Sequence, residues 1–118
     1  MRFLISANTD IGTTKKTNQD SVLVKRLHTC QGEMAFAVLC DGMGGLEKGE
    51  VASATVVRAF DQWVNTELPQ LCGQELEDGK IREDWETIIM DMNRDIAEYG
   101  GRQGIRLGTT VVVLLITQ

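Results

Sequence analysis

The sequence predicts an α+β fold with the element order β-β-β-α-α-β. Three short apolar segments near the N-terminus and one near the C-terminus have the length and composition of β-strands. Between them, two longer segments repeat apolar residues at intervals of three and four, which is typical of amphipathic α-helices. The chain has 118 residues, of which 42% are hydrophobic and 25% charged. This composition is that of a folded protein, and the length corresponds to one domain or less.

The first three expected elements are strands at residues 2–7, 21–25 and 34–40. The third of these, MAFAVLC, is apolar throughout, so we expect other layers to cover both of its faces. The polar stretch HTCQGE separates the second strand from the third and indicates a turn. These two strands should therefore form a hairpin centred on Cys30 and Gln31.

Two amphipathic helices and a last strand follow. The first helix is expected from Glu50 to Leu68-Pro69, because proline interrupts helical hydrogen bonding. Its apolar stripe comprises Val56, Ala59, Phe60, Trp63 and Val64. The second helix is expected to stop at Gly100-Gly101, and its apolar side comprises Ile81, Trp85, Ile88, Ile89, Met92 and Ile96. The run TTVVVLLI at residues 109–116 predicts a strand that needs neighbouring strands and layers on both faces.

Charge and cysteine content exclude several classes of function. A net charge of -5 without a basic stripe argues against binding to nucleic acid. No apolar run approaches the roughly 20 residues that cross a membrane, and the apolar N-terminal part is too short for a secretory signal, so we expect a cytoplasmic protein. Three dispersed cysteines and a single histidine do not favour a zinc site or a Cys-His pair. The cysteines are expected to be buried reduced thiols.

The predicted hairpin brings two carboxylates together. With a turn at residues 30 and 31, Asp20 lies opposite Asp41, at a Cβ separation of about 5 Å. Two facing carboxylates repel each other unless a cation lies between them, and Mg²⁺ and Mn²⁺ prefer such oxygen ligands. Gly42 exposes a backbone carbonyl beside Asp41 and could provide a further ligand. The alternative is an ordinary Asp-Gly turn in which Asp41 caps its own backbone.

The glycine-rich segment GMGGLEKGE also invites comparison with nucleotide-binding loops. A P-loop requires glycine immediately before its lysine, but Glu47 precedes Lys48. Glu47 also occupies the third glycine position of a dinucleotide-binding loop, and acids at a helix start repel a pyrophosphate. The sequence therefore favours a cation over an anion at this loop.

Three motifs in their order and spacing resemble the metal-dependent protein phosphatase family, the type 2C serine/threonine phosphatases of bacterial type. They are TDIGTTKKTNQDS at residues 9–21, CDGMGGLEKGEVAS at residues 40–53 and Gly-Thr-Thr at residues 108–110. The resemblance implies a four-layer α-β-β-α sandwich, in which two β-sheets pack face to face with a helical pair outside each. Residues 1–118 correspond to the N-terminal half of such a domain.

The resemblance also implies a reaction and residues that perform it. Two Mn²⁺ or Mg²⁺ ions would be bridged by Asp41, with the Gly42 carbonyl on one ion and Asp20 contributing directly or through water. A metal-bridging water would attack the phosphorus of phosphoserine or phosphothreonine in a phosphoprotein substrate. Lys15 stands where the family normally carries an arginine that binds the substrate phosphate, and it offers a point charge instead of a two-pronged donor.

The length of the chain departs from the resemblance. Family domains are about twice as long, near the upper range for a single domain. The other half should carry further aspartate ligands, so we expect the 118-residue chain alone to have little or no phosphatase activity. The alternative function is a non-catalytic half-domain that binds a partner. Its open sheet edge would also permit a homodimer or domain exchange.

Overall fold

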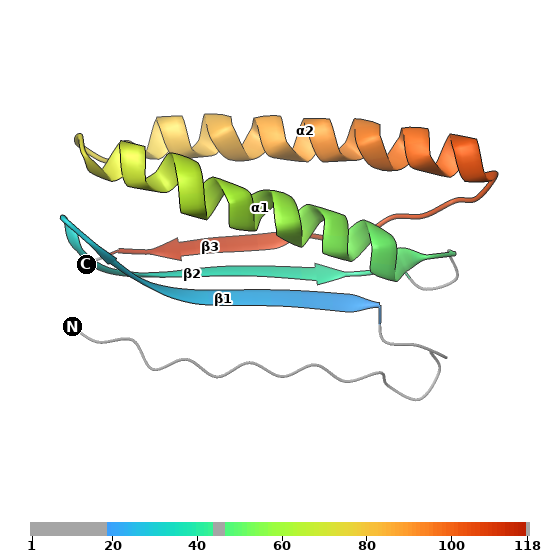
Figure 1. Ribbon diagram of the computed structural model, residues 1–118, viewed down its shortest axis with the longest axis horizontal. Coiled ribbons are helices and arrows are strands. Elements are labelled where there is room, and N and C mark those ends of the chain that lie inside the picture. The colour runs from blue at the N-terminus through green and yellow to red at the C-terminus, as the bar shows by residue number, and fades with distance from the viewer. Residues whose placement is uncertain (1–18, 44–46, 118) are drawn as a thin grey trace.

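A computed structural model describes residues 19–43 and 47–117 of the chain. It contains three strands and two helices, namely β1 (Asp20–Thr29), β2 (Gly32–Asp41), α1 (Gly49–Cys72), α2 (Asp78–Gln103) and β3 (Val112–Ile116). The predicted α+β class is confirmed, and the described elements follow the order β-β-α-α-β (Figure 1). The strand predicted at residues 2–7 lies outside the described residues.

The strands form one antiparallel sheet in the order β1-β2-β3. The hairpin between β1 and β2 has the predicted register, in which Leu23 pairs with Val38 and Asp20 pairs with Asp41. Only residues 30 and 31 form the turn, so both strands are longer than predicted and include most of the polar stretch HTCQGE. Gly32 follows the turn with a φ of 112°, a conformation that favours glycine. The turn therefore sets the register of the hairpin over its whole length.

The hydrophobic core lies between one face of the sheet and the helices. Alternate residues of β2 face α1, and these side chains are almost fully buried: Met34, Phe36, Val38 and Cys40. Phe60 and Trp63 of α1 meet Trp85 of α2 at ring-centroid distances of 6.3 and 5.6 Å. Trp63 Nε1 also donates a hydrogen bond of 2.9 Å to Asp84 of α2. This aromatic cluster joins the two helices above the sheet.

The opposite, open face of the sheet exposes apolar side chains along β3 and the adjoining part of β2, although Ala35 of β2 is buried on it. Leu39 of β2 is 47% exposed, and the neighbouring β3 residues Val112, Leu114 and Ile116 are about half exposed. Both helices lie on the other face, and no described element crosses this one (Figure 1). We expected layers on both faces of the sheet, but the described residues provide a layer, the two helices, on one face only. The four-layer sandwich stays a prediction.

The end predicted for the first helix is wrong. Helix α1 continues through Pro69 to Cys72. Leu68 and Cys72 are both buried and lie one turn apart, so their packing extends the helix past the proline. Pro69 itself is exposed in the last turn, where a single backbone hydrogen bond is lost. Neither helix in the described ranges is both long and apolar enough to cross a membrane.

The end predicted for the second helix is also too early. Helix α2 passes through Gly100 and Gly101 and ends at Gln103. The cap is Gly104, whose φ is 66° and whose N–H donates to the carbonyl of Gly100. Gly100 is needed for a different reason, since a Cβ there would lie 2.8 Å from the carbonyl oxygen of Ile105. The glycine allows the chain to turn back closely over the helix towards β3.

Candidate metal centre

The two carboxylates that the sequence predicted to be neighbours lie opposite each other at the open end of the hairpin. Asp20 is the first residue of β1 and Asp41 is the last residue of β2. In Figure 1 this end lies on the right, where α1 also begins. Directly opposed residues of antiparallel strands have Cβ atoms about 5 Å apart. The register therefore places the two acidic residues on directly opposed positions of the hairpin.

The alternation of side chains along β2 shows which face of the sheet carries these acids. Cys40 is buried under the helices, so its neighbour Asp41 belongs to the opposite, open face. On β1, the Oγ atom of Ser21 contacts Ser53 of α1 at 3.1 Å, which places the adjacent Asp20 on the open face as well. Both carboxylates thus lie at the end of the same apolar surface that Leu39 and β3 form.

The main chain of Asp41 is held by a segment almost 70 residues later in the sequence. Its carbonyl oxygen accepts hydrogen bonds from the Thr110 N–H at 2.9 Å and from Thr109 Oγ1 at 3.1 Å. Its own N–H donates to Thr110 Oγ1 at 3.2 Å. The sequence identified this Gly-Thr-Thr segment only by resemblance. In the structure its physical role is to bind the backbone that carries Asp41.

Gly42 and Gly49 bring three chain segments into close contact. The N–H of Gly42 donates to the carbonyl of Gln19 at 3.2 Å. A Cβ on Gly42 would lie 2.5 Å from the Cβ of Gln19 and 2.8 Å from the carbonyl carbon of Gly49. A Cβ on Gly49 would lie 2.6 Å from Oε1 of Gln19. Packing therefore requires glycine at Gly42, whereas a Cβ at Gly49 would mainly displace the end of the Gln19 side chain.

Ser53 is the residue at this site that sequence reasoning missed. It is completely buried in α1, and its hydroxyl donates to the carbonyl of Gln19 at 2.7 Å. This bond ties the second turn of α1 to the residue that precedes Asp20. The only signal in the sequence was the position of Ser53 at the end of the second motif. Gln19 has a structural role, since its backbone and side chain pack between Gly42 and α1.

Other predicted features lie outside the described residues or differ from expectation. Lys15, the expected phosphate-binding residue, lies outside the described ranges. The expectation of buried thiols holds for Cys40 and Cys72 but is wrong for Cys30, which is exposed in the hairpin turn. Burial raises the pKa of Cys40 to about 11, although a hydrogen bond with Thr109 opposes the shift. This thiol is therefore a poor nucleophile despite its position beside Asp41.

The donor set has the right chemistry for a hard cation but is small. Two carboxylates and a backbone carbonyl at Gly42 are oxygen donors of the kind that Mg²⁺ and Mn²⁺ prefer. Within residues 19–43 and 47–117, however, no group of three or more His, Cys, Asp or Glu side chains could hold a metal ion. The oxygen donors of the described residues are therefore too few to complete a metal site.

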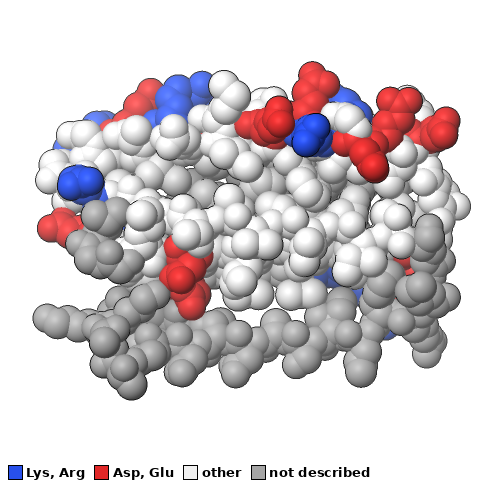
Figure 2. Space-filling view, turned by 180° about the vertical axis from the view of Figure 1, so that it is seen from behind, with Lys and Arg blue, Asp and Glu red and all other residues white. Residues whose placement is uncertain are grey.

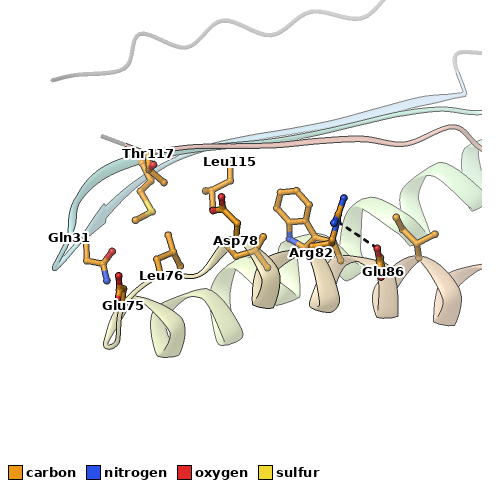
Figure 3. A pocket seen from close by; sticks show the side chains of 12 residues that line it. Gln31, Glu75, Leu76, Asp78, Arg82, Glu86, Leu115 and Thr117 are labelled. Atoms are coloured by element: carbon orange, nitrogen blue, oxygen red, sulfur yellow. Dashed lines mark ion pairs between the residues drawn. The ribbon is translucent and has the colours of Figure 1, made fainter.

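A groove of about 770 Å³ lies at the other end of the molecule, between α2, β3 and the hairpin turn. Figure 3 shows its side chains projecting into the space between the helix and the sheet. The apolar lining comprises Met34, Leu76, Ile81, Trp85, Ile89 and Leu115. Charged residues gather along the helical edge beside a band of uncharged surface (Figure 2), and Arg82 pairs with Glu86 at 3.9 Å on the rim. The groove is distant from the acid pair and has no part in a metal site there.

Comparison with known proteins agrees with the motifs. No family model matches the chain. A Streptococcus pyogenes protein whose name describes it as protein phosphatase 2C-type is 33% identical over 97% of this chain and 43% of its own length. Protein phosphatase PhpP of Streptococcus pneumoniae is 30% identical over 95% of this chain and 42% of its own length.

A solved structure leads to the same group of proteins. The S. agalactiae serine/threonine phosphatase superposes with a TM-score of 0.61 at 30% identity, covering 94% of this chain and 43% of that one. The chain therefore spans about two fifths of the length of the relatives that it matches. The resemblance predicted from the sequence motifs is confirmed.

Proposed function

We propose that this chain, which is related over nearly its whole length to type 2C protein serine/threonine phosphatases, supplies part of a dimetal centre that hydrolyses phosphoserine and phosphothreonine in proteins. The observation that carries the proposal is the opposition of Asp20 and Asp41 at the open end of the hairpin. A like-charge pair at the end of an apolar strand costs free energy unless a cation neutralises it.

In this proposal each residue has a separate task. Two Mn²⁺ or Mg²⁺ ions, when bound, would supply an activated water that attacks phosphorus. Asp41, Asp20 and the carbonyl of Gly42 would hold the ions. The bonds from Thr109 and Thr110 to the Asp41 backbone support this role, because they keep the strand end from moving when the carboxylate is engaged. Lys15 would attract the substrate phosphate.

We further propose that residues 1–118 are the N-terminal portion of a four-layer domain. The open sheet face supports this, since Leu39, Val112 and Leu114 expose apolar side chains that a second sheet could bury. The two acids lie at the end of this same face, where further carboxylates could complete the ligand set. The chain alone, with only Asp20 and Asp41 as described carboxylates at the proposed site, should bind metal weakly and catalyse little or no hydrolysis.

Mn²⁺ titration followed by NMR tests the site directly. Paramagnetic broadening should begin at the amides of Asp41 and Gly42. In Asp41→Asn or Asp20→Asn the affinity for Mn²⁺ should fall at least about tenfold, since even outer partners of metal ligands contribute tenfold or more. Asp95→Asn removes an exposed aspartate of α2 and is the matched control. Unchanged broadening in Asp41→Asn would refute the site. Metal-dependent turnover of p-nitrophenyl phosphate near that of a full domain would refute the proposed inactivity.

A second candidate function is a half-domain that binds a partner or self-associates through the edge of β3. Among the described strands β3 pairs only with β2, and the apolar groove lies beside it. An added strand could pair with this edge and place side chains in the groove. Gel filtration with and without Mn²⁺ distinguishes the candidates. A tight dimer that is indifferent to metal supports association, whereas a monomer at high concentration contradicts it.

A further inference from the structure

Two cysteines meet at the end of the molecule that carries the hairpin turn. Cys30 is exposed in the turn, and Cys72 is the buried last residue of α1. The thiol of Cys30 donates a hydrogen bond of 3.0 Å to the carbonyl oxygen of Cys72. The thiol of Cys30 thus lies against the main chain of Cys72, a cysteine 42 positions later in the sequence.

The surrounding contacts hold this arrangement in place. Nε2 of Gln31 donates to the carbonyl of Cys72 at 2.9 Å and also to the carbonyl of Gln74. Thr29 Oγ1 donates to the carbonyl of Gly32 at 2.8 Å and accepts from the N–H of Gln31, which stabilises the turn itself. The turn is therefore docked against the end of α1, and these hydrogen bonds keep Cys30 beside Cys72.

We propose that Cys30 and Cys72 are a redox modification site, at which a small-molecule disulfide converts the two thiols into a reversible bond between the hairpin turn and α1. The Cys30 thiolate attacks one sulfur of the small disulfide, whose S–S bond breaks and releases one thiolate. The Cys72 sulfur then attacks the Cys30 sulfur of the mixed disulfide and releases the second thiolate. Two protein thiols are oxidised and one small disulfide is reduced to two thiols, which take up the two protons.

Exposure and charge determine the order of the two steps. Cys30 is open to solvent, so it can meet the oxidant. Burial raises the pKa of Cys72, and the neighbouring Cys30 charge raises it further, while a hydrogen bond with Thr29 opposes the shift. A buried thiol with a raised pKa is a poor first nucleophile but can attack a sulfur that is already held beside it.

Cys40 is the natural control within the same chain. Its side chain is fully buried under α1, and its pKa is raised to about 11. It lies beside Asp41, at the opposite end of the hairpin from Cys30. The inference is therefore independent of the proposed phosphatase function, because the modified site and the acid pair are at different ends of the sheet.

The test is oxidation of the native chain with oxidised glutathione, followed by intact mass measurement and thiol labelling in denaturant. The wild type should lose two hydrogens and retain one reactive thiol, and peptide mapping should link residues 30 and 72. Closing this loop should raise the melting temperature by on the order of 10 °C, reversibly on reduction. Cys40→Ser should also lose two hydrogens and link residues 30 and 72, but it should retain no reactive thiol.

The single variants separate the two steps. Cys72→Ser should stop with one glutathione on Cys30, because no second thiol can resolve the mixed disulfide. Cys30→Ser changes an exposed side chain and should keep both remaining thiols reduced. The proposal is overturned if the wild type keeps three reactive thiols, if it stops at the glutathione adduct, or if it forms only disulfide-linked dimers.

Discussion

Replacement of Gly42 by alanine tests how closely the chain segments approach each other at the candidate metal centre. The new Cβ would lie 2.5 Å from the Cβ of Gln19, 2.8 Å from its carbonyl oxygen and 2.8 Å from the carbonyl carbon of Gly49. Because these atoms belong to the backbone or to its first side-chain carbon, rotation of a flexible side chain cannot relieve the clash. The end of β2 would have to move away from Gln19 and from the start of α1.

The expected magnitude follows from overpacking of a dense interior. Such a change typically lowers the free energy of unfolding by about 1–3 kcal/mol, and contacts to backbone on two sides favour the upper end. For a domain of this size that corresponds to a fall in melting temperature of roughly 10 °C. The displacement would also move Asp41 relative to Asp20, so the broadening by Mn²⁺ should weaken in the same variant.

Urea and thermal denaturation followed by circular dichroism provide the assay, with an unchanged m-value as evidence that unfolding remains comparable. Gly101→Ala is the matched control, because a Cβ at this exposed position in α2 meets nothing within 4 Å. Alanine is the better helix former there, so the control should gain about 0.5–1 kcal/mol. If Gly42→Ala is as stable as the wild type, Gln19, Gly42 and Gly49 do not pack as closely as the structure indicates.

Two further predictions concern α2. Gly100→Ala should lower the free energy of unfolding in urea by about 1–3 kcal/mol, because the new Cβ would lie 2.8 Å from the carbonyl oxygen of Ile105. The pKa of Asp84 is lowered: burial raises it, but hydrogen bonds from Trp63 and Lys80 and the charge of Lys80 outweigh burial. The ionised form therefore stabilises the folded chain at neutral pH, and this contribution is lost as the pH falls through the lowered pKa. Asp84→Asn should melt below the wild type at pH 7, with the difference shrinking in acid.

Neighbouring positions again provide the controls. Gly101→Ala should change stability in the opposite direction from Gly100→Ala, although the two glycines are adjacent in α2. Equal effects would show that the carbonyl oxygen of Ile105 does not approach Gly100 closely enough to exclude a Cβ. Asp95→Asn, an exposed aspartate on the same helix, should not reproduce the pH dependence of Asp84→Asn. A constant difference between Asp84→Asn and the wild type across the acid range would contradict the role of the Trp63 and Lys80 contacts.

The register of the hairpin was predictable because it depends on residues close in sequence. A turn at residues 30 and 31 and the strict alternation of a strand are enough to set Asp20 opposite Asp41. The helices were predictable from their periodicity, but their ends were not. Pro69 and Gly100 both lie within helices, since burial of Cys72 in one case and a close chain crossing in the other outweighed local preference.

The sequence by itself determined the strand and helix types, the pairing of the two acids and the resemblance to type 2C phosphatases, because each of these depends on local pattern or on motif spacing. Only the tertiary structure decided which sheet face the helices cover, and therefore that both acids lie on the open face. It also decided that Thr109 and Thr110 hold the Asp41 backbone and that Cys30 meets Cys72. These contacts join residues 42 to 69 positions apart. They arise from how whole elements dock, which no local preference encodes.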